Sequence, residues 1–139
     1  MADFENRLVV ILNEKLEHGK AAMAISHAML GFGAGAVSGE EVRLNKYEDA
    51  SGNVHNNISE MAIVVLKASS NKIREMRNQA RDGGMKYVDF VDTMSIGTYE
   101  EEFRLTKSKK DEELTYWALI LSGSKEKVSE LTSKLSLYR

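Results

Sequence analysis

Short apolar runs divide the chain at intervals. Residues 7–12 (RLVVIL), 61–66 (MAIVVL) and 114–121 (LTYWALIL) are almost continuously apolar, which is typical of strands buried on both faces. Residues 86–92 (KYVDFVD) combine valine with aromatic side chains and are predicted as a further strand. The pattern therefore predicts a sheet of largely buried strands.

Helices are predicted between these runs. Residues 19–30 are rich in Ala and Met and poor in β-branched side chains, which favours helix, and the glycines that begin at Gly31 end it. Ser69 or Ser70 caps a second helix, and Ser124 caps a third. This order of strands and helices indicates an α/β fold.

Two polar stretches lie outside these elements. Residues 41–47 approach an alternation of apolar and polar side chains, which indicates either a half-exposed strand or an irregular excursion. Residues 49–53 have the composition of a turn. Residues 93–113 hold an acidic run and a basic cluster, and we expect them to form a long, irregular surface excursion.

Length and charge limit the class of protein. The chain has 139 residues, of which 42 % are apolar and 29 % charged, and this fits one globular domain over residues 1–139. Its 19 Lys and Arg against 21 Asp and Glu give a net charge of −2 with histidine neutral. That balance argues against a generally basic, nucleic-acid-binding surface.

Residue types that serve metals and cofactors are scarce. The chain has no Cys and three His, which excludes disulfides, thiolate zinc sites and a cysteine nucleophile and gives no metal-site pattern. It contains neither G-x-G-x-x-G nor a Walker sequence, and the glycines at 31–35 follow a predicted helix instead of preceding one. We therefore expect no cofactor and no metal.

The chain carries no pattern typical of export or membrane insertion. The first five residues include two acids and begin no apolar core of a signal peptide. Residues 21–37 are the longest weakly polar stretch, but Ser26 and His27 interrupt it, and it falls short of the ~20 apolar residues that span a bilayer. The expected location is cytoplasmic, without membrane contact.

Candidate chemistry collects where the predicted strands end. In open α/β sheets the carboxyl ends of parallel strands form the usual ligand crevice, and this rule brings Lys20 and Asp92 toward one crevice. Lys20 and His27 also share one stripe of the first predicted helix. Each residue has a plainer interpretation: Lys20 as a solvated surface charge, His27 as a packed histidine bonded to a backbone carbonyl, and Asp92 as a turn or cap residue.

Several stretches resemble type II peptidyl-tRNA hydrolases. Residues 8–34 (LVVILNEKLEHGKAAMAISHAMLGFGA) are similar to the opening strand and helix of that family, with Gly19-Lys20 and Ser26-His27-Ala28 at the same spacing. Residues 61–92 resemble its next strand, helix and strand, and residues 127–139 resemble its last helix and Leu-Tyr terminus. The resemblance covers roughly two thirds of the chain.

A closer resemblance is to a bacterial branch of unknown function related to those hydrolases. That branch carries Tyr-x-Asp-x-x-Gly-x-x-His before its second long strand, and residues 47–55 (YEDASGNVH) match this pattern. The resemblance implies a three-layer α/β/α sandwich around a four-stranded mixed sheet. It also implies a homodimer, since the related hydrolases are commonly dimers.

The chemistry that the resemblance implies is cleavage of the ester between a peptide and tRNA. Lys20 and Asp92 match two residues of that family, so Lys20 is expected to stabilise an oxyanion and Asp92 to orient a water or the lysine. Thr93 or Thr98 is expected to donate a hydrogen bond. The catalytic residues implied are therefore Lys20, Asp92 and Thr98.

The resemblance also implies binding residues, with two departures from the family pattern. His18, Gly19, His27 and Thr93 are expected to line the binding site, and His27 to lie behind the catalytic residues. His18 stands where the family has the first of two loop lysines, and Ile96 stands where it has a functional threonine. Both changes remove groups that the peptidyl-tRNA reaction uses.

Two classes of function follow from these observations. The first is a hydrolase of an ester or amide in a small-molecule or peptidyl substrate, with tRNA disfavoured by the net charge and by the acids of the 93–113 stretch. The second is a non-catalytic ligand-binding or interaction protein on the same scaffold. The altered loops favour the second class over true peptidyl-tRNA hydrolysis.

Overall fold

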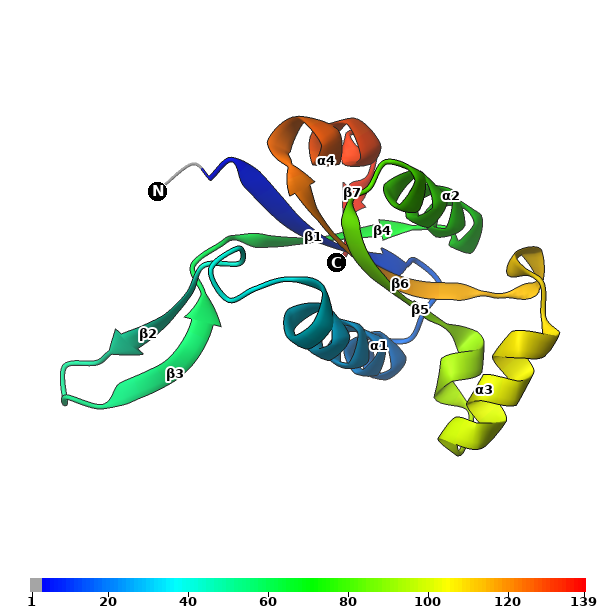
Figure 1. The fold of residues 1–139 in the computed structure, drawn as a ribbon, viewed down its shortest axis with the longest axis horizontal. Helices are drawn as coiled ribbons and strands as arrows, with labels where there is room; N and C mark the ends of the chain where they lie inside the picture. Colours follow the sequence, from blue (N-terminus) through cyan, green and yellow to red (C-terminus); the bar gives the residue numbers. More distant parts are fainter. Residues whose placement is uncertain (1–3) are drawn as a thin grey trace.

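The protein is built on a five-stranded mixed sheet (Figure 1). The computed structural model describes residues 4–139. The strands lie in the order β5-β6-β1-β4-β7, in which β1 and β4 are parallel and the other neighbouring pairs are antiparallel. In chain order they are β1 (Asn6–Asn13), β4 (Ile63–Ala68), β5 (Lys86–Val91), β6 (Tyr116–Ser124) and β7 (Ser136–Leu137).

The carboxyl ends of β1, β4 and β5 meet at one edge of this sheet. β1 and β4 are parallel, and β6 is antiparallel to both β1 and β5, with Ala118 opposite Leu12 on one side and Phe90 on the other. Three strands therefore end at this edge and β6 begins there. The observed topology therefore has the edge of strand carboxyl ends at which open α/β sheets usually bind ligands.

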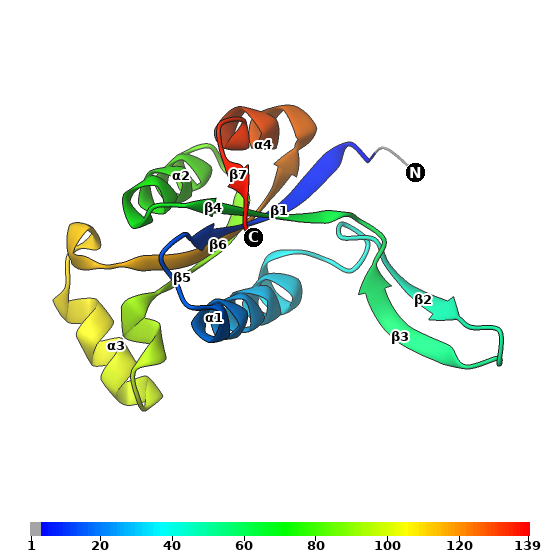
Figure 2. The same ribbon diagram turned by 180° about the vertical axis from the view of Figure 1, so that it is seen from behind.

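Helices cover both faces of the sheet. α1 (His18–Gly31), which continues into a π-helical turn η1 (Phe32–Ala36), lies on one face. α2 (Ser70–Asp82) and α4 (Lys125–Thr132) lie on the other (Figures 1 and 2). The predicted α/β fold is confirmed.

The central strand β1 explains the continuous apolar run at the start of the chain. Leu8, Val10 and Leu12 belong to the core on the α1 face, while Val9 and Ile11 belong to the core on the α2 face. All five are at most 5 % exposed. Because successive strand residues point to opposite faces, a strand covered on both sides must be apolar at each position.

The two long helices form for the reasons their sequences indicate. Ala21, Ala24 and Ala28 are the buried residues of α1, and their small side chains let that helix lie close to the sheet. α2 begins where the hydroxyl of Ser69 accepts a hydrogen bond from the backbone N–H of Lys72 (3.1 Å). Its apolar stripe is fully buried.

The expectation of a four-stranded sheet is wrong by one strand. After α4 ends, the chain returns as β7 and pairs with β4, where Leu137 lies opposite Leu66 and Ser136 opposite Lys67. A two-residue strand has no periodicity of its own. Its pairing depends on where the returning chain lies in space.

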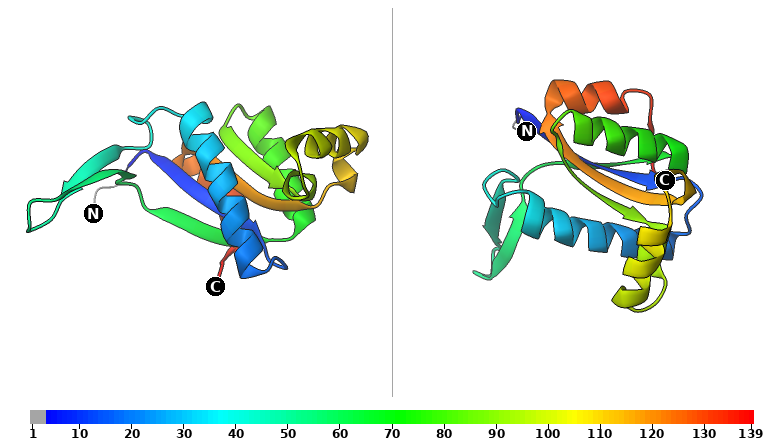
Figure 3. Two further views of the ribbon diagram at one scale, coloured as in Figure 1. Left: turned by 90° about the horizontal axis from the view of Figure 1, so that it is seen from below. Right: turned by 45° about the vertical axis from the view of Figure 1, so that its right-hand side comes forward.

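Residues 44–59 form a separate hairpin, which we call the arm. Its strands are β2 (Leu44–Glu48) and β3 (Val54–Ser59), which pair only with each other in the sheet order. The arm projects from the body at the end opposite α3 (Figures 1 and 3). The strand interpretation of residues 41–47 is therefore confirmed for 44–47, but β2 is exposed along its whole length.

The irregular excursion expected over residues 93–113 is wrong. The stretch contains η2 (Asp92–Ser95), the helix α3 (Tyr99–Ser108) and a short turn η3 (Asp111–Glu113). Acidic residues occupy the first turn of α3 and Lys107 its last turn, which favours the helix dipole. The charge runs that indicated a loop stabilise a helix instead.

Candidate functional site

Lys20 and Asp92 lie at the carboxyl edge of the sheet, at the end of the molecule that carries α3. Figures 1 and 2 show the first turn of α1 on this same end, beside η2 and α3. Lys20 comes from that first turn, and Asp92 follows β5 directly. Because β1 and β5 end at the same edge of the sheet, Lys20 and Asp92 lie close to each other although they are 72 positions apart in the sequence.

A cavity of about 340 Å³ contains both residues. The structure brings Lys20, Asp92 and Thr93 to its wall, as expected for all three. The remaining lining residues come from α1, η2, α3 and β6: Met23, Ser95, Ile96, Leu105, Lys109 and Trp117. Two ammonium groups therefore face one carboxylate, which favours a ligand with an anionic group.

The Asp92 carboxylate is held by neighbouring backbone. Its Oδ1 accepts a hydrogen bond from the N–H of Thr115 (3.1 Å), and its own N–H donates to the carbonyl of Thr115 (3.0 Å). The Ser95 hydroxyl donates to the Asp92 carbonyl (2.6 Å). Asp92 does begin a turn, as its plainer interpretation held, but within residues 4–139 its second carboxylate oxygen has no hydrogen bond.

Lys20 has no carboxylate partner among the residues that the structure describes. Its ammonium lies 5.9 Å from the centre of the Trp117 ring, a cation–π distance. Lys20 itself is exposed. It is therefore a surface charge, as one interpretation held, and also a cation directed at the cavity and available to a ligand.

The two threonines expected near the site hold structure together. Thr93 is buried, and its hydroxyl lies 2.6 Å from that of Thr106, which donates its own proton to the Glu102 carbonyl (2.7 Å). Thr93 must then be the donor to Thr106, since a hydroxyl has one proton. Thr98 caps α3 by accepting from the N–H of Glu101 (3.4 Å) and does not line the cavity of Lys20 and Asp92.

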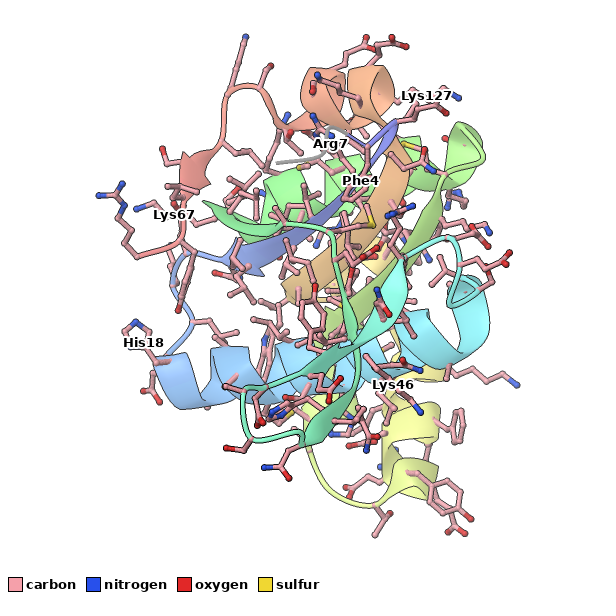
Figure 4. The ribbon with its side chains drawn as sticks, turned by 90° about the vertical axis from the view of Figure 1, so that its left-hand side faces the viewer. Phe4, Arg7, His18, Lys46, Lys67 and Lys127 are labelled. Carbon is pink, nitrogen blue, oxygen red and sulfur yellow. The ribbon has the colours of Figure 1, made fainter. Side chains whose placement is uncertain are left out.

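The other expected binding residues lie around the cavity without lining it. His18 is exposed at the start of α1, with its ring 5.9 Å from that of Tyr138, and Figure 4 shows it at the outer side of the molecule. Gly19 is exposed in the same turn. His27 lies further along α1, with its ring 5.7 Å from that of Phe90.

His27 lines a second, larger cavity of about 670 Å³. Met23 and Ser95 line both cavities, so the two adjoin along α1. The interpretation of His27 as a packed histidine bonded to a carbonyl is wrong, because its side chain is exposed and has no hydrogen bond within residues 4–139. The second cavity is mostly apolar. Its further lining residues include Val88, Phe90, Met94 and Tyr99, together with the acids Asp89 and Glu102.

Trp117 and Lys109 are site residues that the sequence did not reveal. Trp117 separates the Lys20 cavity from a third one of about 380 Å³, which Lys15 and Asn13 line. It lies at this edge only because β6 begins where β1 and β5 end. Lys109 enters the site at the end of α3. For Trp117, the one signal in the sequence was that it is the only tryptophan of the chain and stands in a predicted strand.

A polar network beside the site anchors α2 to β6 and η3. The Tyr116 hydroxyl donates to Asp111 (2.5 Å), and the Arg74 guanidinium donates to the carbonyls of Asp111 (3.1 Å) and Leu114 (2.6 Å). Burial and the Asp111 carboxylate raise the pKa of Tyr116 well above its usual range. Tyr116 thus stays protonated and acts as a structural donor. Nowhere in residues 4–139 do three or more His, Cys, Asp or Glu side chains cluster to hold a metal ion.

Fold and site together define a small α/β protein with a Lys–Asp cavity at the carboxyl edge of a mixed sheet. The chain belongs to the family described as protein of unknown function DUF2000, whose family model matches residues 6–139. The expectation of a family of unknown function is therefore confirmed. Its relation to peptidyl-tRNA hydrolases stays a prediction.

One solved structure gives the fold independent support. The chain is similar to a protein of unknown function, Atu0240, from Agrobacterium tumefaciens str. C58, with a TM-score of 0.84 and 19 % identity over 99 % of this chain and 100 % of that one. At this identity the likeness shows the fold alone. No curated protein matches the chain. Across residues 4–139, no helix combines the length and apolarity that a bilayer crossing requires.

Proposed function

We propose that this protein is a hydrolase that cleaves an ester or amide bond in a small anionic or peptidyl substrate. The observation that carries the proposal is the single cavity lined by Lys20, Asp92 and Lys109. The Asp92 carboxylate is held in place with one oxygen that accepts no hydrogen bond, and the Lys20 ammonium, which lies over the Trp117 ring, has no carboxylate partner among residues 4–139. The resemblance to type II peptidyl-tRNA hydrolases, which carries Lys20 and Asp92, adds support.

The chemistry assigns one role to each of the two groups. The free oxygen of Asp92 accepts a proton from a water, whose oxygen attacks the substrate carbonyl carbon. Lys20 stabilises the oxyanion that forms, and the C–O or C–N bond then breaks, with the proton from Asp92 passing to the leaving group. Lys109 binds an anionic group of the substrate. Thr93 holds η2 against α3 by donating a hydrogen bond to the Thr106 hydroxyl.

A small substrate fits the charges better than an extended tRNA backbone. Lys46, Lys67 and Lys127 lie well apart in Figure 4, and the first turn of α3 carries Glu100–Glu102, of which Glu102 lines the adjoining cavity of His27. Phosphate-backbone binding needs several cations along one surface. The proposal is therefore a substrate whose anionic part fits between Lys20 and Lys109.

A non-catalytic ligand-binding protein is the second candidate. It is favoured by the engagement of both threonine hydroxyls, one with Thr106 and one at the start of α3. The Thr93 hydroxyl already donates to Thr106, and Thr98 does not line the cavity of Lys20 and Asp92, so neither is placed to donate to a substrate oxyanion there. In that case the cavity binds an anionic ligand and releases it unchanged.

The test is hydrolysis of peptidyl-tRNA and of a panel of short esters with neutral and anionic acyl chains. We expect turnover of anionic esters, with Lys20→Ala and Asp92→Asn each lowering kcat/KM by about a hundredfold. Lys127→Ala is the matched control, since that lysine lies on α4 away from the cavity. Circular dichroism checks the fold of each variant.

Each result assigns the site differently. Wild-type turnover that survives both substitutions would exclude Lys20 and Asp92 as the catalytic pair. Binding of an anionic ester without turnover, weakened by Lys20→Ala, would identify a ligand-binding protein. Salt-sensitive cleavage of peptidyl-tRNA, with no cleavage of the esters, would assign the activity of type II peptidyl-tRNA hydrolases to this chain.

A further inference from the structure

The arm exposes apolar surface that nothing in the described chain covers. Exposed fractions run from 46 % for Leu44 and 49 % for Tyr47 to 60 % for Val54 and 61 % for Ile58. These side chains alternate over the two faces of the hairpin, since Tyr47 pairs with His55 and Glu48 with Val54. The hairpin projects from the body (Figure 3), and both of its faces are therefore partly apolar.

The arm is nevertheless well ordered at its tip. The Asp49 carboxylate accepts hydrogen bonds from the N–H groups of Ser51 (2.9 Å) and Asn53 (3.0 Å) and contacts the His55 ring (2.9 Å). Gly52 takes the positive φ of 84° that this turn requires. The Tyr-x-Asp-x-x-Gly-x-x-His stretch is thus a turn motif that shapes the arm.

The root of the arm is anchored to the body. Arg43 lies over the Phe4 ring, 4.4 Å from its centre, and pairs with Glu60 (3.1 Å). The Ser59 hydroxyl donates to the carbonyl of Val42 (2.5 Å). A rigid, anchored hairpin binds a partner at a lower entropic cost than a flexible loop does.

A two-stranded hairpin alone is only marginally stable in water, whereas three or more strands with an apolar face are stable. The outer edges of β2 and β3 are both unpaired in the sheet order, and an open edge is a template for another strand. The charged side chains of β2 indicate which strand can pair with it. Lys46 and Glu48 flank Tyr47, and within residues 4–139 neither has an ion-pair partner.

We infer that the arm is a homodimerisation element, in which β2 pairs antiparallel with β2 of a second copy of this chain. With Tyr47 of one copy opposite Tyr47 of the other, antiparallel pairing sets Lys46 of each copy opposite Glu48 of the other. The two ion pairs are related by the two-fold axis, as in an isologous interface. The two hairpins become one four-stranded sheet.

The β2 edge fits this arrangement better than the β3 edge does. The middle of β3 carries Asn56 and Asn57, which have no charge to select a partner, and His55 is already bound to Asp49. Between the pairs Asn45–Ile58 and Tyr47–His55, β3 has one residue more than β2. The bulge therefore lies on β3 and makes the β3 edge the poorer template for an added strand.

The test is sedimentation of the full chain over a concentration series. We expect the wild type to be a dimer. Lys46→Glu and Glu48→Lys should each weaken the dimer about tenfold or more, because each turns two opposite-charge contacts into like-charge contacts. The combined Lys46→Glu and Glu48→Lys variant should dimerise like the wild type, since it exchanges the charges and keeps them complementary.

Two further measurements fix the register. A mixture of the two single variants should form a heterodimer, because one β2 is then acidic and the other basic. The matched control, Lys127→Glu on α4, should not change the dimer. A wild type that stays monomeric at every concentration would overturn the inference. So would single variants that dimerise normally, or a double variant as weak as the singles.

Discussion

The two ends of this molecule are built on different supports. The cavity end rests on β1, β5 and β6, of which most of β1 and β6 and the last two residues of β5 are buried, and α1 and α3 frame it. The arm rests on its own turn and on a small anchor around Arg43. The buried strands of the core thus position the residues of the cavity, whereas local hydrogen bonds and the anchor around Arg43 determine the shape of the arm.

A truncation in the core should destabilise the protein far more than one in the arm. Ile11 is fully buried in β1, so Ile11→Ala should lower the free energy of unfolding by about 2–5 kcal/mol. Val54→Ala, an apolar truncation in the exposed arm, should cost less than about 0.5 kcal/mol in dilute protein. Urea unfolding of both variants measures the difference. Equal losses would show that the arm is part of the cooperative core.

A smaller effect is expected at the joint between η2 and α3. Thr93→Val keeps the volume but removes the hydroxyl that donates to Thr106, which should cost about 1 kcal/mol and speed hydrogen exchange in α3. Thr115→Val is the matched control, because Thr115 is exposed and holds Asp92 through its backbone. Unchanged exchange in α3 would show that Thr93 does not hold this joint.

The smallest effect is a pH dependence confined to the arm. The His55 ring and the backbone N–H of Asn53 hold the pKa of Asp49 below its ordinary value of 3.8. A lowered pKa means that the ionised carboxylate stabilises the turn at higher pH, and that this stabilisation is lost as the pH falls through the folded pKa. Tyr47 and Val54 resonances should therefore shift in acid while core resonances stay fixed.

The control for this acid response is Asp49→Asn, which keeps a side-chain oxygen for the N–H groups of Ser51 and Asn53. Its arm should show no transition over the acid range. An acid transition that persists in this variant would assign the titration to another group.

The elements that the sequence predicts best are those whose pattern is set by burial. β1 and α2 have continuous or striped apolar residues because the core covers them, and both form where the pattern indicates. β7 and α3 escaped prediction for different reasons. β7 is too short for any pattern, and α3 has no buried residue, so its sequence is mostly polar.

The candidate site divides in the same way. Lys20 and Asp92 could be placed together because both follow strands that run in one direction. Trp117 and Lys109 could not, since one depends on an antiparallel strand and the other on a helix that the polar sequence concealed. Ile96 occupies the place of the threonine of the resembling hydrolases, and Thr98, two positions later, was the expected substitute for it, yet the Thr98 hydroxyl caps the start of α3.

The place of β1 in the middle of the sheet also sets the order in which the chain can fold. β1 is synthesised well before its neighbour β6, which begins more than a hundred residues later, and the Asn13 side chain donates to the carbonyl of Tyr116, 103 positions away. Such distant pairing slows folding. Until β6 has been synthesised, the nascent chain must carry an apolar strand with one edge open, and a stop in translation before β6 would leave a fragment prone to aggregate.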